Sequence, residues 1–198
     1  MSTPLPAVHP DMDVLLRARD PVPGRDLAEV RRKWGEYAAR LSPPRPDWLE
    51  VNDEDIQVDG GRPVRVRFYR HPDATGRQPC VLYLHGGGFI KGDLDSSDSV
   101  AWGYAADSGA MVCSVDYRLA PEHPWPAAFD DSYGVLMALV EGADRYGVDP
   151  ERIVVGGESA GGFLSASIAV KARDQGSVRL AGQMIVYGGA GTAENSQS

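Results

Sequence analysis

Apolar residues along the chain change from a helical spacing to short continuous runs at about residue 80. Before that point they recur every three or four residues over 11–19 and 26–41, which predicts two amphipathic helices. Two shorter segments follow, 54–58 and 64–70, and a glycine-containing turn separates them. The second segment alternates apolar and polar residues, so the pair predicts a β-hairpin with one exposed face.

Beyond residue 80 the apolar runs cover 80–84, 110–115 and 153–155. Continuous apolar runs of this length are typical of parallel strands that are covered on both faces. Segments with helical spacing separate the runs, over 98–108, 127–140 and 143–146. This alternation predicts an α/β fold with a mainly parallel sheet and helices on both faces. In such a sheet, functional residues are expected at the carboxyl ends of the strands.

Composition and charge narrow the class of protein. The 198 residues are 42% apolar and 24% charged, which is enough for one sizeable core. A net charge of −8 argues against binding to nucleic acid and to anionic membrane surfaces. No apolar run approaches the length of a membrane span, and the first residues lack the layout of a signal peptide. These features predict a cytoplasmic protein.

The predicted organisation has three parts. Residues 1–46 are expected to form an N-terminal helical segment and a proline-rich linker, and residues 47–187 the α/β core. Residues 188–198 show no apolar periodicity and are expected to be disordered. Cys80 and Cys113 lie in apolar strands, which favours buried free thiols over a disulfide framework. Two separate cysteines and four scattered histidines give no metal-ligand spacing, so no metal site is predicted.

One candidate site follows the apolar run 153–155, where residues 157–161 read Gly-Glu-Ser-Ala-Gly. The form Gly-x-Ser-x-Gly places a serine on a strained strand-to-helix turn, where side chains two residues away would collide with neighbouring backbone. Gly157 and Gly161 relieve those collisions. A helical pattern follows directly, so strand, turn and helix are all predicted, with Ser159 as the candidate nucleophile. The alternative is an ordinary glycine-rich turn between a strand and a helix.

A second candidate site is the run 85–89, His-Gly-Gly-Gly-Phe, at the carboxyl end of another predicted strand. Consecutive glycines let backbone N–H groups approach a substrate oxygen, as an oxyanion hole for a tetrahedral acyl intermediate requires. A nucleotide-binding loop is the rival interpretation. It fails on spacing, because neither glycine-rich segment reads Gly-x-Gly-x-x-Gly or ends in Gly-Lys-Ser/Thr. The two motifs together favour acyl transfer.

At these motifs the chain resembles the hormone-sensitive-lipase-like branch of the α/β-hydrolase esterases. The resemblance covers roughly residues 54–187 in the order and spacing of that family. It rests on three segments: 85–95 (His-Gly-Gly-Gly-Phe-Ile-Lys-Gly-Asp-Leu-Asp), 115–128 (Val-Asp-Tyr-Arg-Leu-Ala-Pro-Glu-His-Pro-Trp-Pro-Ala-Ala) and 157–162 (Gly-Glu-Ser-Ala-Gly-Gly). The implied fold is the α/β-hydrolase fold with an N-terminal helical cap.

The resemblance also implies roles for individual residues. Ser159 would be the nucleophile, while His85 and Gly86 would shape the glycine loop. Glu158 stands where the family usually has Asp, a change that keeps the carboxylate. The implied oxyanion hole consists of the backbone N–H groups of Gly87, Gly88 and Ala160. The implied substrates are small carboxylic esters with short to medium acyl chains, and no cofactor is implied.

The base and acid of a catalytic triad are not found after Ser159. In α/β-hydrolases they follow the serine, with the acid first and the histidine last. No histidine follows Ser159 here, and the strand at 183–187 resembles the family's sixth, so the last strands are expected to be missing. His85 and His123 could lie near the site, but the resemblance gives both structural roles. The chain is therefore expected to be weak or inactive alone.

Two other interpretations stay open. The chain could be a non-catalytic, truncated or degenerate hydrolase-fold protein, or a partner chain could supply the missing strands. If the strand 183–187 is an open sheet edge, self-association through it is expected.

Asp116 and Arg118 are expected in a buried, salt-bridged turn, and Asp130 and Asp131 on a solvated helix face or in local ion pairs. Trp34 and Tyr37 either line an acyl pocket or belong to the core.

Overall fold

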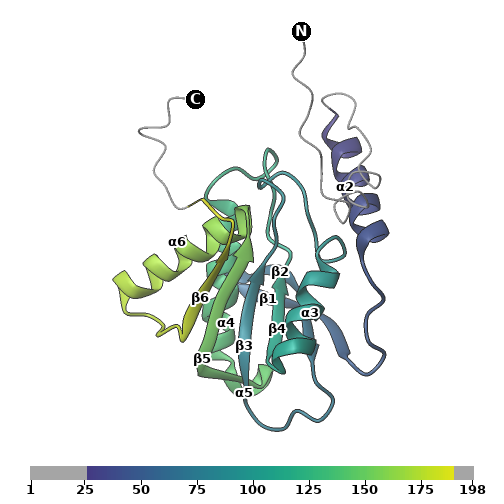
Figure 1. Cartoon of the computed structure of the whole chain (residues 1–198). Coiled ribbons are helices and arrows are strands. Elements are labelled where there is room, and N and C mark those ends of the chain that lie inside the picture. Colours follow the sequence, from purple (N-terminus) through teal and green to yellow (C-terminus); the bar gives the residue numbers. More distant parts are fainter. Residues whose placement is uncertain (1–25, 190–198) are drawn as a thin grey trace.

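The computed structural model describes residues 26–189, and a six-stranded sheet forms its centre (Figure 1). The strand order is β1-β2-β4-β3-β5-β6. β1 and β2 form an antiparallel hairpin, β2 is antiparallel to β4, and β4, β3, β5 and β6 are parallel to one another. The strands are β1 (Glu50–Val58), β2 (Arg62–Arg70), β3 (Gln78–Leu84), β4 (Met111–Val115), β5 (Val148–Glu158) and β6 (Gly182–Val186).

Helices cover both faces of this sheet, as the sequence predicts. α4 packs on β1 and β5, and α6 packs on β3, β5 and β6, while α3 packs on β2 and β4. No helix within the described part of the chain is long and apolar enough to cross a membrane. The helices are α2 (Leu27–Leu41), the 3-10 turn η2 (Asp59–Gly61), α3 (Asp98–Ser108), α4 (Ala127–Glu141), α5 (Ala143–Tyr146) and α6 (Ala160–Gln175).

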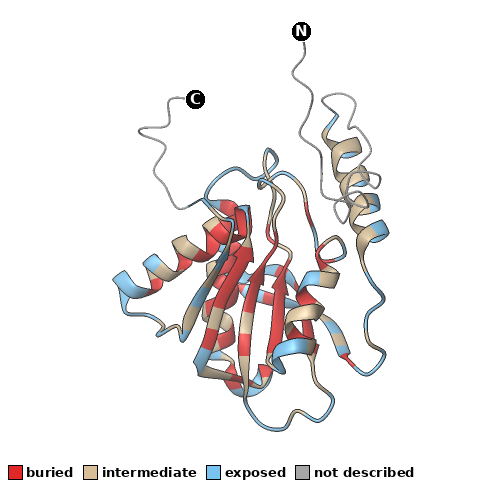
Figure 2. Cartoon of the chain, viewed as in Figure 1, coloured by how far each residue is buried: buried red, intermediate tan, exposed pale blue. Residues whose placement is uncertain are grey.

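The strands β3 and β4 at the centre of the sheet are mostly apolar because both of their faces are largely buried (Figure 2). All five residues of β4 are buried. In β3, Leu82 and Leu84 join the larger core cluster under α4 and α6, whereas Tyr83 belongs to the smaller cluster around α3. Neighbouring side chains of a strand point to opposite faces, so each face needs its own apolar residues. Both cysteines are buried and free, as predicted.

The predicted hairpin and the helices α2 to α5 are confirmed, but two strands begin earlier than predicted. β1 starts at Glu50, and its polar first half pairs with β2 in register, with Glu50 opposite Arg70. An edge strand can pair in this way without an apolar pattern, because one face is solvated. β5 starts at Val148, which pairs with Gln78 ahead of a register shift.

Some predictions lie outside the described residues or at their limit. The helix predicted over 11–19 and residues 190–198 of the tail predicted over 188–198 lie outside the described residues. The division into segments 1–46, 47–187 and 188–198 stays a prediction. β6 is the last strand of the sheet and pairs with β5 alone among the described strands. The self-association expected through this edge also stays a prediction.

Candidate active site

Ser159 lies at the turn between β5 and α6, with a backbone conformation that is unusual for a residue other than glycine. Its φ is 53° and its ψ is −114°, a strained region in which non-glycine residues are held by their surroundings. The Ser159 N–H donates to the carbonyl of Val186 at 2.9 Å, and its own carbonyl accepts from Phe163 N–H at 3.1 Å. The serine is exposed. The turn therefore presents its hydroxyl at the carboxyl end of a central strand.

Two glycines allow this turn to approach strand β3. A β-carbon built on Gly157 or on Gly161 would overlap the carbonyl oxygen of Leu84, the last residue of β3. Gly161 is also close to the next carbonyl, since its β-carbon would lie 2.7 Å from the oxygen of His85. The collisions predicted from the sequence are thus real, and both are with backbone. Any larger residue would push the turn away from β3.

The glycine loop leaves the carboxyl end of β3 beside this turn. Gly87 has a φ of 131° and Gly88 a φ of 63°, values that glycine adopts without strain. The carbonyl of Gly87 accepts the N–H groups of Ile90 and Lys91 at 3.3 and 3.2 Å, which closes a tight turn. Among the described residues, the N–H groups of Gly87 and Gly88 have no hydrogen-bond partner. These two donors are free for a ligand.

Glu158 connects the serine turn to the glycine loop. Its Oε1 accepts the hydroxyl of Tyr83 at 2.6 Å and the N–H of Gly86 at 3.3 Å. Its Oε2 is buried and has no partner within residues 26–189. Burial raises the pKa of the Glu158 carboxyl, and the hydrogen bond from Tyr83 opposes that rise. The side chain spans the two candidate motifs and fixes their separation.

The buried side chain of His85 packs against the glycine loop. Its ring is fully buried and stacks on Tyr117, with ring centroids 4.1 Å apart. The Nδ1 atom donates to the carbonyl of Gly86 at 2.8 Å, and the hydroxyl of Tyr117 donates to the carbonyl of His85 at 2.6 Å. Burial lowers the pKa of the imidazole to about 4. His85 is therefore neutral near pH 7, and its low pKa and full burial argue against its use as a base for Ser159.

This buried histidine predicts a pH-dependent stability. The unfolded imidazole takes up a proton near its ordinary pKa of 6.5, whereas the folded ring does so only near 4. Between these values the unfolded chain binds more protons, so stability falls as the pH falls. From pH 7 to pH 5, the wild type is expected to lose about 2 kcal/mol of unfolding free energy that the His85→Gln variant does not lose. Urea unfolding at several pH values measures this, and parallel curves for the two proteins would contradict it.

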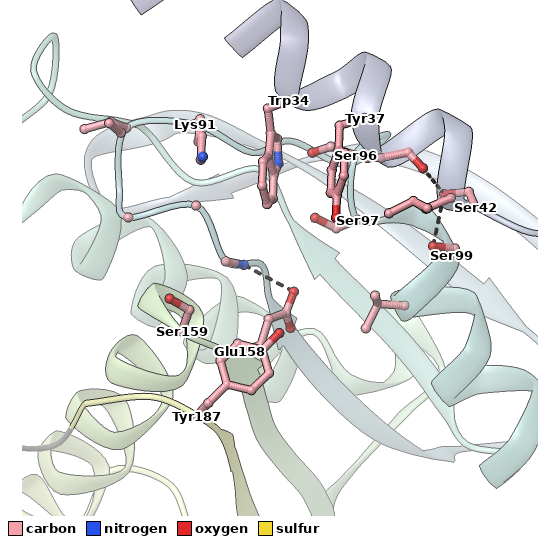
Figure 3. A pocket seen from close by; sticks show the side chains of 17 residues that line it. Trp34, Tyr37, Ser42, Lys91, Ser96, Ser97, Ser99, Glu158, Ser159 and Tyr187 are labelled. Carbon is pink, nitrogen blue, oxygen red and sulfur yellow. Dashed lines mark hydrogen bonds between the residues drawn. The ribbon is translucent and has the colours of Figure 1, made fainter. Parts of the chain in front are cut away.

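An opening of about 840 Å³ lies above Ser159, between α2 and the glycine loop (Figure 3). Trp34 and Tyr37 of α2 line it, and α2 has no buried residue, so their interpretation as core residues is wrong. His123 is exposed and is not among the lining residues. The others are Ala38, Leu41, Ser42, Gly86, Gly87, Gly88, Ile90, Lys91, Ser96, Ser97, Ser99, Val100, Glu158, Ser159 and Tyr187.

Sequence reasoning missed the polar wall of this cavity. Ser96, Ser97 and Ser99 line it at the start of α3, and Tyr187 lines it from the segment after β6. The only sequence signal for these residues is that each lies shortly after a glycine-rich loop or a strand end. Among residues 26–189, no three His, Cys, Asp or Glu side chains are grouped so that they could hold a metal ion.

A serine on a strained turn at the end of a parallel strand, beside a loop of consecutive glycines, defines a hydrolase-type site. The model of a protein family described by its alpha/beta hydrolase fold matches residues 81–198. The chain belongs to this α/β-hydrolase family, in its hormone-sensitive-lipase-like branch.

Curated relatives and solved structures agree with this assignment. The chain is 39% identical over 185 residues to the esterase LipI of Mycobacterium tuberculosis and 40% identical over 187 residues to the carboxylesterase NlhH of the same species. These matches cover 92% and 90% of the chain but only 57% of each relative. An esterase from Pyrobaculum calidifontis superposes with a TM-score of 0.80 at 37% identity, over 92% of this chain and 58% of that structure.

Proposed function

We propose that this chain carries the nucleophile and the oxyanion hole of a carboxylic ester hydrolase. The observation that carries the proposal is that the exposed Ser159 lines one cavity together with Gly87 and Gly88, whose N–H groups have no hydrogen-bond partner within residues 26–189. A reacting carbonyl in that cavity could meet a nucleophile and hydrogen-bond donors at once. Two relatives in Mycobacterium tuberculosis are an esterase and a carboxylesterase, which supports the same reaction class.

In the proposed reaction, the Ser159 oxygen attacks the carbonyl carbon of the ester. The carbonyl π bond opens, and the resulting oxyanion accepts hydrogen bonds from the N–H groups of Gly87, Gly88 and Ala160. Ala160 is the first residue of α6, so the helix dipole favours negative charge at this point. The intermediate then collapses to an acyl-serine as the bond to the alcohol oxygen breaks, and that oxygen takes up the proton that Ser159 gave up, so that an alcohol leaves. Water finally hydrolyses the acyl-serine and releases the acid.

Each half of this reaction needs a base that accepts a proton, first from Ser159 and then from water. No histidine follows Ser159 in this sequence. The ring of His85 is buried with Nδ1 bonded to Gly86, and His123 is exposed outside the cavity lining. Neither His85 nor His123 is placed to serve as that base, so the second candidate function is a hydrolase-fold protein that binds esters without turning them over.

The proposed substrates are small esters with short to medium acyl chains, and no cofactor is proposed. Trp34, Tyr37 and Leu41 give the cavity an apolar wall on the α2 side, which suits an acyl chain. Nucleic acid is not a proposed partner, because the net charge of −8 would repel phosphates. A cytoplasmic location stays a prediction.

The test is hydrolysis of p-nitrophenyl acetate and butyrate by this chain and by its Ser159→Ala variant, with and without added imidazole. Imidazole hydrolyses these esters by itself, so the readout is the difference between the two proteins in the same buffer. We expect a weak serine-dependent rate, on the order of 10³-fold above water, because the hydrogen-bond donors and substrate binding accelerate the reaction even without a triad. Imidazole should raise that rate by acting as the base.

The outcomes separate the two candidate functions. Serine-dependent rates that imidazole increases would support the proposed nucleophile and a missing base. A high serine-dependent rate without imidazole would mean that the protein supplies its own base. Equal rates for the wild type and Ser159→Ala in every buffer would contradict the catalytic proposal and favour the non-catalytic one.

A further inference from the structure

Helix α2 lies over the cavity without burying any of its side chains. Most helices are held in place by an apolar face that is removed from water. α2 instead faces the cavity with Trp34 and Tyr37, and polar contacts join it to the core. Lys91 Nζ lies 4.1 Å from the ring centroid of Trp34, and Ser42 hydrogen-bonds Ser99 at 3.1 Å beyond the helix end. Among the described residues, directed interactions therefore hold this helix over the cavity.

Arg31 of α2 makes the largest set of these interactions. Its Nε donates to the carbonyl of Ile90 at 2.7 Å. Its Nη2 donates to the carbonyl of Ala120 at 3.1 Å, and both Nη atoms hold the carboxylate of Glu122 at 2.8 Å. A planar guanidinium with this fork of donors is suited to such bidentate pairing. One side chain thus joins the helix to two separate loops.

The two loops that Arg31 holds are also joined to each other at the glycine loop. The N–H of Ala120 donates to the carbonyl of Phe89 at 2.8 Å, and the N–H of Ile90 donates to the carbonyl of Gly87 at 3.3 Å. The Lys91 N–H also donates to the carbonyl of Gly87, at 3.2 Å. Because a peptide unit is planar, the Ile90 carbonyl that Arg31 holds and the Lys91 N–H turn together. The Gly87 carbonyl shares a peptide unit with the Gly88 N–H, so the orientation of the Gly88 N–H depends on this chain of contacts.

We propose that Arg31 is a positioning residue that aligns the Gly88 N–H of the glycine loop and couples this alignment to the position of α2. When α2 is seated, the guanidinium holds the Ile90 carbonyl, and the Gly87 turn is fixed. When α2 moves away, that bond is lost and the turn is free to rotate. The functional meaning of this coupling rests on the proposed oxyanion hole, but the coupling itself does not require catalysis.

The ion pair with Glu122 keeps this arrangement charged at ordinary pH. The hydrogen bonds from Arg31 hold the pKa of the Glu122 carboxyl down at about 2. The same loop also contains Arg118 and His123. Arg118 pairs with Asp131, and the backbone N–H of His123 donates to the carbonyl of Leu119. Within residues 26–189, the Arg31 guanidinium joins this loop to α2.

The test is residue-resolved amide hydrogen exchange by NMR on the whole chain. The reporter amides are Ile90 and Lys91, which bond to Gly87, and Ala120, which bonds to Phe89. The variants are Arg31→Met, which keeps most of the aliphatic stem, and Arg31→Lys, which keeps the positive charge but not the forked set of N–H donors. The matched control is Arg32→Met, because Arg32 is on the same helix and its ion pairs are with Glu29 and Glu36 of that helix.

We expect Arg31→Met to speed exchange at the three reporter amides about tenfold and to loosen α2 as well, since both depend on one side chain. Arg31→Lys should restore part of the protection, and Arg32→Met should leave the reporters unchanged. Faster exchange in α2 with unchanged reporters would overturn the proposal, because Arg31 would then hold the helix alone. Equal effects of Arg31→Met and Arg32→Met would also overturn it. None of these readouts needs ester turnover, so they are independent of the proposed activity.

Discussion

Gly161→Ala is expected to destabilise the protein by about 3 kcal/mol or more, a large effect for the addition of one methyl group. The new β-carbon would overlap the carbonyl oxygen of Leu84 and lie 2.7 Å from the carbonyl oxygen of His85. Both atoms are backbone, and both residues are fully buried. No side-chain rotation can relieve the contact, so strand β3 or helix α6 must shift.

The same shift should disturb the candidate site. Leu84 ends β3 directly before the glycine loop, and Gly161 follows Ser159 by two residues. Pushing the two segments apart would separate Ser159 from the N–H groups of Gly87 and Gly88. Any serine-dependent hydrolysis measured for the wild type should therefore be lost in Gly161→Ala, even in the fraction of molecules that stays folded.

Gly103→Ala is the matched control for this prediction. Gly103 lies in helix α3, and a β-carbon built there meets nothing within 4 Å. Alanine is the better helix former, so this variant should be more stable by about 0.5–1 kcal/mol. Urea unfolding followed by circular dichroism measures both changes. If Gly161→Ala were as stable as the wild type, the close packing of the turn on β3 would be wrong.

Asp131→Ala is expected to cost about 3 kcal/mol of unfolding free energy. The Asp131 side chain is only 1% exposed, although it belongs to a helix that the sequence suggests is solvated at this point. Its carboxylate pairs with Arg62 at 2.7 Å and with Arg118 at 2.8 Å, and it also accepts the backbone N–H of Arg118 at 2.9 Å. Removing it leaves that N–H and two guanidinium groups without their acceptor.

The expected loss of unfolding free energy is at the lower end of the range for removing one partner of a buried ion pair. The two arginine side chains are 31% and 32% exposed, so water can partly solvate them once the carboxylate is gone. Asp130→Ala is the matched control, because Asp130 is the neighbouring residue on the same helix and is exposed. Its effect should stay within about 0.5 kcal/mol. A cost for Asp131→Ala no larger than that of Asp130→Ala would contradict the prediction.

These two aspartates show where sequence reasoning succeeds and where it stops. Both were expected on a solvated face or in local ion pairs, and the solvated face is right for Asp130 and wrong for Asp131. The expected salt bridge of Arg118 is present, but its partner is Asp131 rather than a residue of the same turn. Asp116 is instead partly buried, and burial raises its pKa to about 6. Asp130 and Asp131 have the same side chain, and their burial differs because of what packs against each of them.

The sequence by itself determined the α/β alternation, the hairpin, the strand-to-helix turn at Ser159 and the need for glycine at 157 and 161. Each of these depends on residues a few positions apart, through periodicity, backbone conformation or steric contact. The tertiary structure decided that His85 packs under the glycine loop, that the serines of 96–99 line the cavity and that Arg31 joins α2 to two loops. Those contacts join segments up to 91 residues apart, and local pattern carries no information about which distant segments the fold brings together.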